Sequence, residues 1–461
     1  MKLSTYFKQH PHRPGAEKAL PGVQRGLPNN HETGEWPDSN AWMLSFGGLV
    51  HFLLGVSLFI PGFSLITVGN HTGVQSALIL IGICGILRVS QGRLRRDLPV
   101  LGLLITWAIS LIITVLIGGW KPINVHPMVS LDVCLFVIGI FSLTCDMPES
   151  YDLGLQKGLL AGAVLSALYA LYQQAALRFG LPFGVPPLNN PSFYEITDTA
   201  NWGLRSFAFF SEPSILAAYL IPMAVATLYS AATLHAAKST WWWLISLLIF
   251  VGLVTTGSVS IFVSLPVALF LCLFAQRRRL DAWIKVSVAL LSFALLVLLL
   301  IVSFGWAASL SDVLVSRVSN AKYDESLISR YGMDIASLRI FEENPIFGYG
   351  VNPDPDYFFE RMPPETTIYQ SADSLVGGDS LLLVILSGQG ICGFFCFAAL
   401  IFVGVRRSSG NVFLQSALIG CVVVMTIQCS NIDLYLIWVV MGLCLARPAN
   451  GRAAVAHAAQ T

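Results

Sequence analysis

Arg205 and Glu212 carry opposite charges and enclose the run "RSFAFFSEPS" just ahead of a long apolar segment. "SEPS" predicts a helix start, with Ser211 or Glu212 as the cap and Pro213 in the first turn, where an acidic residue is favourable. The unpaired N–H groups of such a start, next to a guanidinium, can hold an anion. We therefore expect phosphate recognition here. Two structural alternatives stay open: Arg205 and Glu212 pair with each other, or Glu212 only serves the helix start.

A second set of charges lies on a helix that we predict between Ser326 and Asn344, where apolar residues recur at helical spacing. The helix should stop at "NPIFGYG", because a residue before proline disfavours the helical conformation and the two glycines permit a sharp bend. The remaining acidic candidates on the same side of the membrane are Asp373, Asp379 and Asp433.

Two arginines of this helix, Arg330 and Arg339, each have a structural alternative to ligand binding. Arg339 has acids at i+3 and i+4, Glu342 and Glu343, and we favour a surface ion pair there. Arg330 has Asp334 at i+4, and both interpretations stay open. The two arginines are nine positions apart, about 180° round a straight helix. At most one of them should contact a given ligand unless the helix breaks.

The composition defines the surroundings of these residues, since 55% of the 461 residues are hydrophobic and only 11% are charged. Soluble proteins have about 25% charged residues, and a membrane-crossing helix needs about 20 apolar ones. We predict an all-α polytopic membrane protein with about twelve spans. They lie near 43–66, 74–88, 98–117, 128–145, 157–179, 213–233, 240–256, 258–275, 284–304, 379–403, 412–428 and 433–446. The seventh and eighth could merge, because only the weakly polar turn "TTGSVS" separates them.

Lysine and arginine set the orientation, because basic residues are retained on the cytoplasmic side. Most of the 27 fall in the tails and in alternate connections, so both termini should be cytoplasmic and the long loops periplasmic. The net charge of +1 argues against nucleic acid as a partner. The predicted parts are a cytoplasmic tail 1–40, spans one to nine in 41–304 with a periplasmic loop 180–211, a large periplasmic loop 305–378, spans ten to twelve in 379–446, and a cytoplasmic tail 447–461.

Two further patterns have unremarkable explanations. The nine cysteines lie in or beside apolar segments without a CxxC pair, so we expect packing residues rather than a disulfide framework or a metal site. "GQGICG", residues 388–393, spells the GxGxxG of dinucleotide sites, yet it interrupts an apolar run instead of following a strand. We therefore expect close packing of a membrane helix through small residues, and no cofactor.

Three motifs together resemble one family. "RSFAFFSEPS" resembles the arginine and "F-x-EPS" element of bacterial Wzy-type polysaccharide polymerases. "SRYGMDIASLRIFEENPIFGYGVN", residues 329–352, resembles the outer-loop signature of the O-antigen ligase and polymerase superfamily, and "DSLLLVILSGQGICG", residues 379–393, resembles the span that follows it. The order of the motifs, the span count and the long outer loop agree with that family.

The resemblance implies a glycosyltransferase-C-like, metal-independent glycosyltransferase in the bacterial inner membrane. Its donor would be a glycan on undecaprenyl diphosphate and its acceptor another lipid-linked repeat unit, with a chain-length regulator protein as a candidate partner. By position, Arg205 and Arg330 would hold the diphosphate, with Arg339 as a further candidate. Glu212 or Asp379 could act as base or orient the acceptor.

Two alternatives to a polymerase stay open. O-antigen ligases, which transfer the glycan to the lipid A core, usually have a histidine where this chain has Asp379, and the loop 305–378 contains none; this favours a polymerase over a ligase. A transporter also fits twelve spans, and the prolines Pro222 and Pro266 inside spans are compatible with it. Carriers often show internal repeats with broken helices in matching halves, and we find no such duplication.

Overall fold

The structure is a computed structural model, and it describes residues 45–61, 64–68, 72–94, 97–118, 125–145, 148–182, 205–210, 212–233, 236–258, 260–275, 284–293, 295, 325–350, 355–367, 380–427 and 435–446. The predicted tails 1–40 and 447–461 lie outside the described residues, as do much of the two long loops and the three acids Asp373, Asp379 and Asp433.

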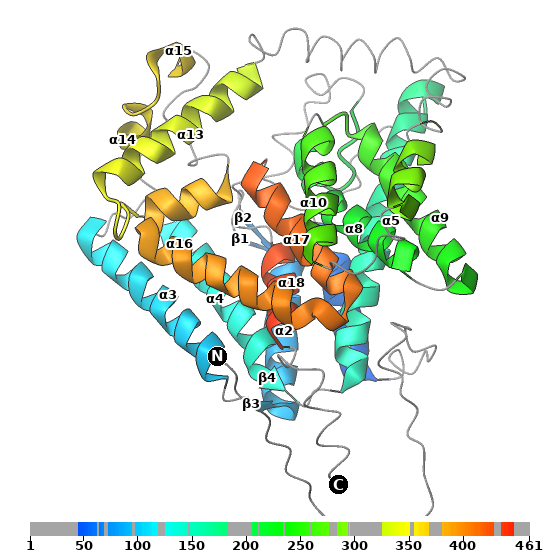
Figure 1. The fold of residues 1–461 in the computed structure, drawn as a ribbon, viewed down its shortest axis with the longest axis horizontal. Helices are drawn as coiled ribbons and strands as arrows, with labels where there is room; N and C mark the ends of the chain where they lie inside the picture. Colours follow the sequence, from blue (N-terminus) through cyan, green and yellow to red (C-terminus); the bar gives the residue numbers. More distant parts are fainter. Residues whose placement is uncertain are drawn as a thin grey trace, which may run out of the picture.

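The described chain is almost entirely helical (Figure 1). Its helices are α1 (Phe46–Ser57), α2 (Ser76–Gln91), α3 (Leu98–Gly118), α4 (Val125–Leu143), α5 (Glu149–Phe179), α8 (Pro213–Thr233), α9 (Ala236–Thr255), α10 (Ile261–Ala275), the unlabelled helix Ile284–Phe293, α13 (Glu325–Glu343), α14 (Pro355–Phe359), α15 (Pro364–Thr367), α16 (Leu381–Arg407), the 3-10 turn η5 (Ser408–Gly410), α17 (Val412–Ile427) and α18 (Tyr435–Ala446). Two small antiparallel hairpins, which we did not predict, join β1 (Ser64–Val68) to β2 (Thr72–Gln75) and β3 (Arg93–Leu94) to β4 (Thr144–Cys145).

The helices are those of a polytopic membrane protein. In the described residues three segments are long and apolar enough to cross a bilayer, namely Ser150–Phe179, Pro213–Thr233 and Leu381–Gly410, and nine apolar helices are shorter. The predicted count of twelve spans stays a prediction. The seventh and eighth predicted spans are two helices, α9 and α10, because the chain turns at Thr256 and Gly257 between them.

Helix α8 is the most enclosed of the long helices. Its most apolar stretch is 94% buried, and it packs against α5, α9, α10 and α17. A helix that is hydrophobic all round belongs in an interior, so the lack of any polar stripe in "ILAAYLIPMAVATLY" explains this position. The neighbouring helix α17 comes close at Gly420, where a Cβ would lie 2.7 Å from the Cα of Pro222.

One end of the bundle, which we name the β3–β4 end, holds buried ion pairs. Arg88 is 1% exposed, donates from Nε to His51 Nε2 at 3.0 Å and pairs with Asp152. Arg407 pairs with Asp97 and donates to the carbonyl of Leu445 at 2.9 Å. These bonds tie α2 to α5 and the end of α16 to the start of α3 and the end of α18.

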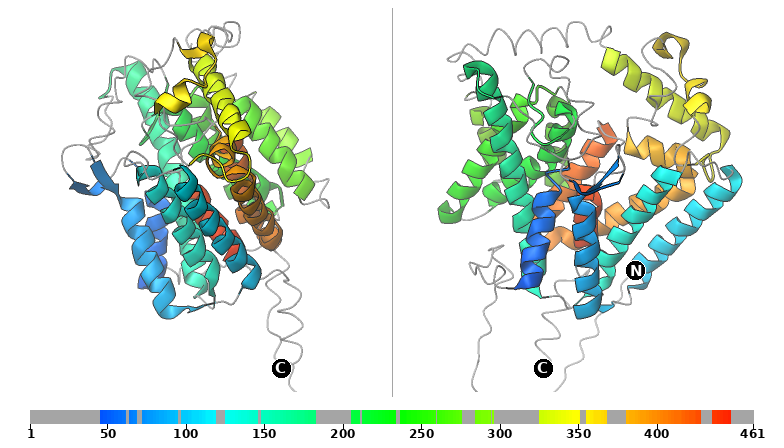
Figure 2. Two further views of the ribbon diagram at one scale, coloured as in Figure 1. Left: turned by 90° about the vertical axis from the view of Figure 1, so that its left-hand side faces the viewer. Right: turned by 180° about the vertical axis from the view of Figure 1, so that it is seen from behind.

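The other end, which we name the α13 end, carries α13, α14 and α15 (Figures 1 and 2). The helix predicted between Ser326 and Asn344 is confirmed as α13, with its bounds shifted by one residue. It packs against α16, and α14 and α15 pack against it. Ala336, Ile340, Phe358 and Met362 form a small separate hydrophobic core there.

The cysteines that the structure describes behave as packing residues. Seven are free thiols, and six of these are buried: Cys84, Cys134, Cys272, Cys396, Cys421 and Cys444.

Candidate functional site

The segment 205–210 that begins with Arg205 lies fully buried on the C-terminal third of α5. Ser206 Oγ donates to the carbonyl of Ala170 at 2.8 Å, and the ring of Phe209 stacks on Tyr169 with centroids 4.7 Å apart and planes 15° apart. Because α5 starts at the β3–β4 end and runs away from it, this segment lies towards the opposite end of α5. The aromatic residues between Arg205 and Glu212 thus anchor the segment to the bundle.

Arg205 itself is only 8% exposed and donates from Nε to the carbonyl of Thr256 at 2.8 Å. A backbone hydrogen bond joins the same two segments next to this contact, because Ser206 N donates to the carbonyl of Thr255 at 3.0 Å. Gly257 adopts φ +58°, and a Cβ there would lie 3.3 Å from Arg205 Cγ. A guanidinium in an apolar bundle needs acceptors. The turn between α9 and α10 supplies one of them.

Glu212 stands directly before α8, as the predicted helix start requires. Its backbone carbonyl accepts from Leu216 N at 3.1 Å, and its side-chain Oε2 accepts from Ser214 Oγ at 2.9 Å. Its side chain is half-buried. Among the described contacts none pairs this carboxylate with Arg205. The two side chains are therefore positioned by different elements: Glu212 by the start of α8, and Arg205 by the turn between α9 and α10.

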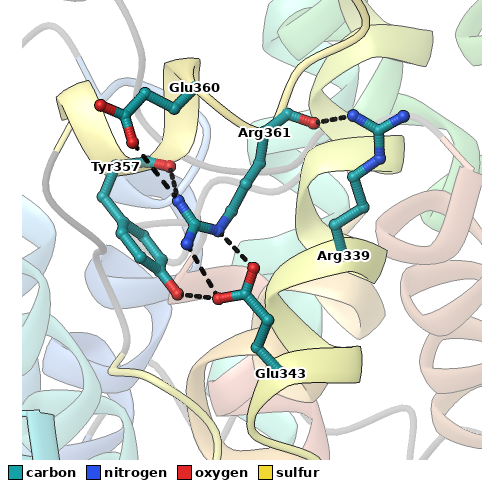
Figure 3. A network of polar contacts seen from close by, with 5 residues as sticks. All are labelled: Arg339, Glu343, Tyr357, Glu360 and Arg361. Atoms are coloured by element: carbon teal, nitrogen blue, oxygen red, sulfur yellow. Dashed lines mark hydrogen bonds and ion pairs between the residues drawn. The ribbon is translucent and has the colours of Figure 1, made fainter.

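The two arginines of α13 differ in their surroundings. Arg330 is half-buried and Arg339 is exposed. Arg339 does not form the local ion pair that its spacing predicted, because its Nη1 donates to the carbonyl of Arg361 at 2.8 Å (Figure 3). Glu343 is paired with Arg361 instead. A bidentate pair with the guanidinium of Arg361, which lies in the turn after α14, competes well against a local i+4 contact on an exposed surface.

Sequence reasoning missed Arg361, which organises the α13 end. Its Nε and Nη2 both donate to Glu343 at 2.9 Å, its Nη1 donates to the carbonyl of Tyr357 at 2.8 Å, and its guanidinium carbon lies 3.2 Å from the centre of the Tyr357 ring. The ring of Tyr349 stacks on the ring of Tyr357, with centroids 3.9 Å apart and planes 6° apart. The spacing of four positions between Tyr357 and Arg361 could have indicated their contact. Their partner Glu343 is too distant in the sequence to be predicted from spacing.

The charges of this cluster shift two titrations. Hydrogen bonds from Arg361 and then from Tyr357 lower the pKa of Glu343 below its ordinary value. Burial, and then the hydrogen bond that the Tyr357 hydroxyl donates to Glu343, raise the pKa of Tyr357. The carboxylate and the neutral phenol are therefore both stabilised in the forms that hold the cluster together.

The two glycine motifs of the sequence meet each other. Helix α16 breaks at Gly390, which has φ 62° and ψ −162°, and the turn "NPIFGYG" after α13 fills the break. Four backbone hydrogen bonds join them: Tyr349 N to Ser387 O at 2.9 Å, Gly350 N to Gly388 O at 2.9 Å, Ile391 N to Pro345 O at 2.9 Å and Cys392 N to Ile346 O at 3.3 Å. We name this arrangement the interlock.

Close approach requires glycine at the interlock, as the prediction of packing through small residues implied. A Cβ on Gly348 would lie 2.3 Å from the carbonyl carbon of Gly388, and a Cβ on Gly390 would lie 2.4 Å from that of Ile346. Side chains of α3 complete the arrangement, since Trp107 Nε1 donates to Gln389 Oε1 and Thr114 Oγ1 donates to the carbonyl of Phe347 at 2.7 Å. The interlock therefore fixes α13 to α16 and α3.

The comparisons with known proteins place these features in a family context. Residues 244–398, which begin within α9 and end within α16, match the family model described as O-antigen ligase. No curated protein matches the chain. The matched segment contains the turn that holds Arg205, helix α13 and both halves of the interlock. Over these residues the match supports the O-antigen ligase and polymerase superfamily that the three sequence motifs indicate.

Proposed function

We propose that this protein polymerises lipid-linked polysaccharide repeat units. The family match supports a glycosyltransferase of the O-antigen ligase and polymerase type in general. In the proposed reaction, the glycan on undecaprenyl diphosphate is transferred to the acceptor sugar of another lipid-linked repeat on the periplasmic face of the bacterial inner membrane. Both termini would be cytoplasmic, and a chain-length regulator protein is a candidate partner.

One observation carries this proposal: a buried arginine outside the matched segment is fixed by a hydrogen bond to a turn inside it. Arg205 Nε donates to Thr256 O at 2.8 Å, and the segment that carries Arg205 is held on α5. A guanidinium with a fixed orientation can stabilise the negative charge that develops on a departing diphosphate without reorganising in the transition state. A flexible surface arginine would lack this advantage.

The chemistry assigns a role to each candidate. The acceptor hydroxyl oxygen forms a bond to the anomeric carbon, the bond from that carbon to the diphosphate oxygen breaks, and the electron pair leaves with the polyprenyl diphosphate. The configuration at carbon inverts. Glu212 or Asp379 takes the hydroxyl proton or orients the acceptor. Arg205 binds the diphosphate, with Arg330 or Arg339 as the second cation.

O-antigen ligase activity is the second candidate, because the matching family model carries that description. Ligase and polymerase share the donor and differ in the acceptor, which would be the lipid A core for a ligase. The absence of a histidine from the loop 305–378 favours the polymerase.

Deleting the gene in the native host, restoring it with variants and separating surface glycan by gel tests the proposal. We expect deletion to collapse the ladder of glycan lengths to a single repeat, wild type to restore it, and Arg205→Ala to fail although the protein is present in the membrane. Arg178→Ala is the matched control, since Arg178 is an exposed arginine in the last turn of α5. It should restore the full ladder.

The other outcomes separate the alternatives. Loss of all lipid-A-attached glycan on deletion would identify a ligase. Long chains that persist with Arg205→Ala would remove Arg205 from the site, and a full ladder after deletion would overturn the proposed function itself.

A further inference from the structure

Gln173 of α5 is a fully buried side chain that contacts the backbone of the Arg205 segment. Its Oε1 accepts from two consecutive amides, Phe207 N at 3.1 Å and Ala208 N at 2.8 Å, and its side chain is 0% exposed. Among the residues that the structure describes, its Nε2 finds no hydrogen-bond partner. A buried amide with an unpaired donor is costly, so the contacts of Oε1 are the part of this side chain that contributes favourably.

The backbone that Gln173 holds has an unfavourable conformation. Ala208 has φ 48°, and among the described residues it is the one non-glycine residue with a positive φ. This left-handed region is unfavourable for an L-residue, because the Cβ approaches the following carbonyl oxygen. Consecutive amides that converge on one oxygen form a concavity which elsewhere binds anions. Here the carbonyl oxygen of Gln173 occupies it.

This conformation determines where Arg205 lies. The two residues directly before Phe207 are bonded to the α9–α10 turn, through Ser206 N to Thr255 O and Arg205 Nε to Thr256 O. The neighbouring Gln174 donates from Nε2 to the side-chain Oγ of Ser206 at 3.0 Å, a contact with a side chain rather than with the backbone of the segment. The segment is therefore held between α5 on one side and the turn on the other, and the two amides bound to Gln173 are its main backbone attachment to α5.

We propose that Gln173 is a positioning residue for Arg205. By satisfying the amides of Phe207 and Ala208, it keeps the segment in the one conformation that sets the Arg205 guanidinium against Thr256. This inference rests on the proposed function, in which Arg205 binds the diphosphate. Gln173 itself touches no substrate.

The test measures binding of undecaprenyl diphosphate to the full-length protein in detergent, from the ligand-induced rise in unfolding temperature. Gln173→Met keeps the length of the side chain and removes the acceptor, and we expect it to weaken binding about tenfold, the effect of losing roughly one well-placed hydrogen bond. The matched variant Gln174→Met, on the adjacent residue, should stay within about twofold of wild type.

A double-variant cycle separates positioning from general destabilisation. If Gln173 acts through Arg205, then Gln173→Met should add little to the loss caused by Arg205→Ala, because residues that act as a unit are not additive. Equal losses in the wild-type and Arg205→Ala backgrounds would overturn the inference, as would unchanged binding by Gln173→Met. Where Gln173→Met does not fold, Ala208→Gly in the same chain relieves the left-handed strain and provides a foldable background for the cycle.

The failures are distinguishable. If Arg205→Ala weakens binding and Gln173→Met does not, only the positioning role is lost. If Arg205→Ala binds undecaprenyl diphosphate as wild type does, the assignment of the diphosphate to Arg205 fails and the positioning role fails with it. The glycan ladder after gene deletion reports independently on the proposed function.

Discussion

Replacing Gly390 by alanine should destabilise the protein through the interlock. Gly390 adopts φ 62° and ψ −162°, a region that side-chain-bearing residues essentially never occupy. The added Cβ would also lie 2.4 Å from both the carbonyl carbon and the oxygen of Ile346, which are backbone atoms and cannot rotate away. The turn after α13 must therefore separate from α16.

The magnitude follows from two contributions. Backbone strain of this kind costs about 1–3 kcal/mol. Separation weakens the bonds from Ile391 N and Cys392 N to the 345–346 carbonyls, each worth about 0.5–1.5 kcal/mol net. We expect Gly390→Ala to lower the free energy of unfolding by about 2–6 kcal/mol.

The assay is a titration with denaturing detergent that follows loss of helix by circular dichroism. Gly102→Ala is the matched control, because Gly102 lies in α3, which packs on α16, and a Cβ there meets nothing within 4 Å. Alanine should stabilise that helix by up to about 1 kcal/mol. Gly350→Ala separates the two contributions. Gly350 has φ 124° but open space around a Cβ, so alanine there adds backbone strain without a steric clash that separates the turn from α16. Equal unfolding of Gly390→Ala and Gly102→Ala would refute the reasoning.

Two further predictions concern charged contacts. Asp97→Asn leaves the buried Arg407 without its ion-pair partner, so we expect a loss of about 3–5 kcal/mol in the same titration; the exposed Glu365→Gln should unfold like wild type, and an equal result for both would contradict this. The lowered pKa of Glu343 means that its contribution to stability is present above the ordinary carboxyl pKa and is lost as pH falls through the lowered value. Unfolding temperature measured against pH should therefore fall more steeply on acidification for wild type than for Glu343→Gln, and parallel curves would exclude this contribution.

Local sequence signals predicted the features that local physics determines. Pro213 and the unbroken apolar run after it gave the bounds of α8, and the apolar spacing with Asn344 before a proline gave those of α13. The turn at Thr256 was visible as a weak polarity, but its role as the support of Arg205 was not, because that contact joins residues 51 positions apart.

The contacts that build the site were hidden for the same reason. The interlock consists of backbone hydrogen bonds, which leave no side-chain pattern beyond the glycines that permit them. Spacing predicts a local ion pair for Arg339, because Glu343 stands at i+4. In the structure Arg361, in the turn after α14, binds that carboxylate instead through two parallel hydrogen bonds. Gln173 resembles any other polar residue of a helix until the segment 205–210 is laid against it.

The enclosure of α8 has a consequence for whatever meets Glu212. Because α8 is packed on every side, its N-terminal end cannot tilt unless α5, α9, α10 and α17 move as well. If Glu212 meets the acceptor as proposed, adaptation to acceptors of different shape has to come from the chain that surrounds this fixed carboxylate.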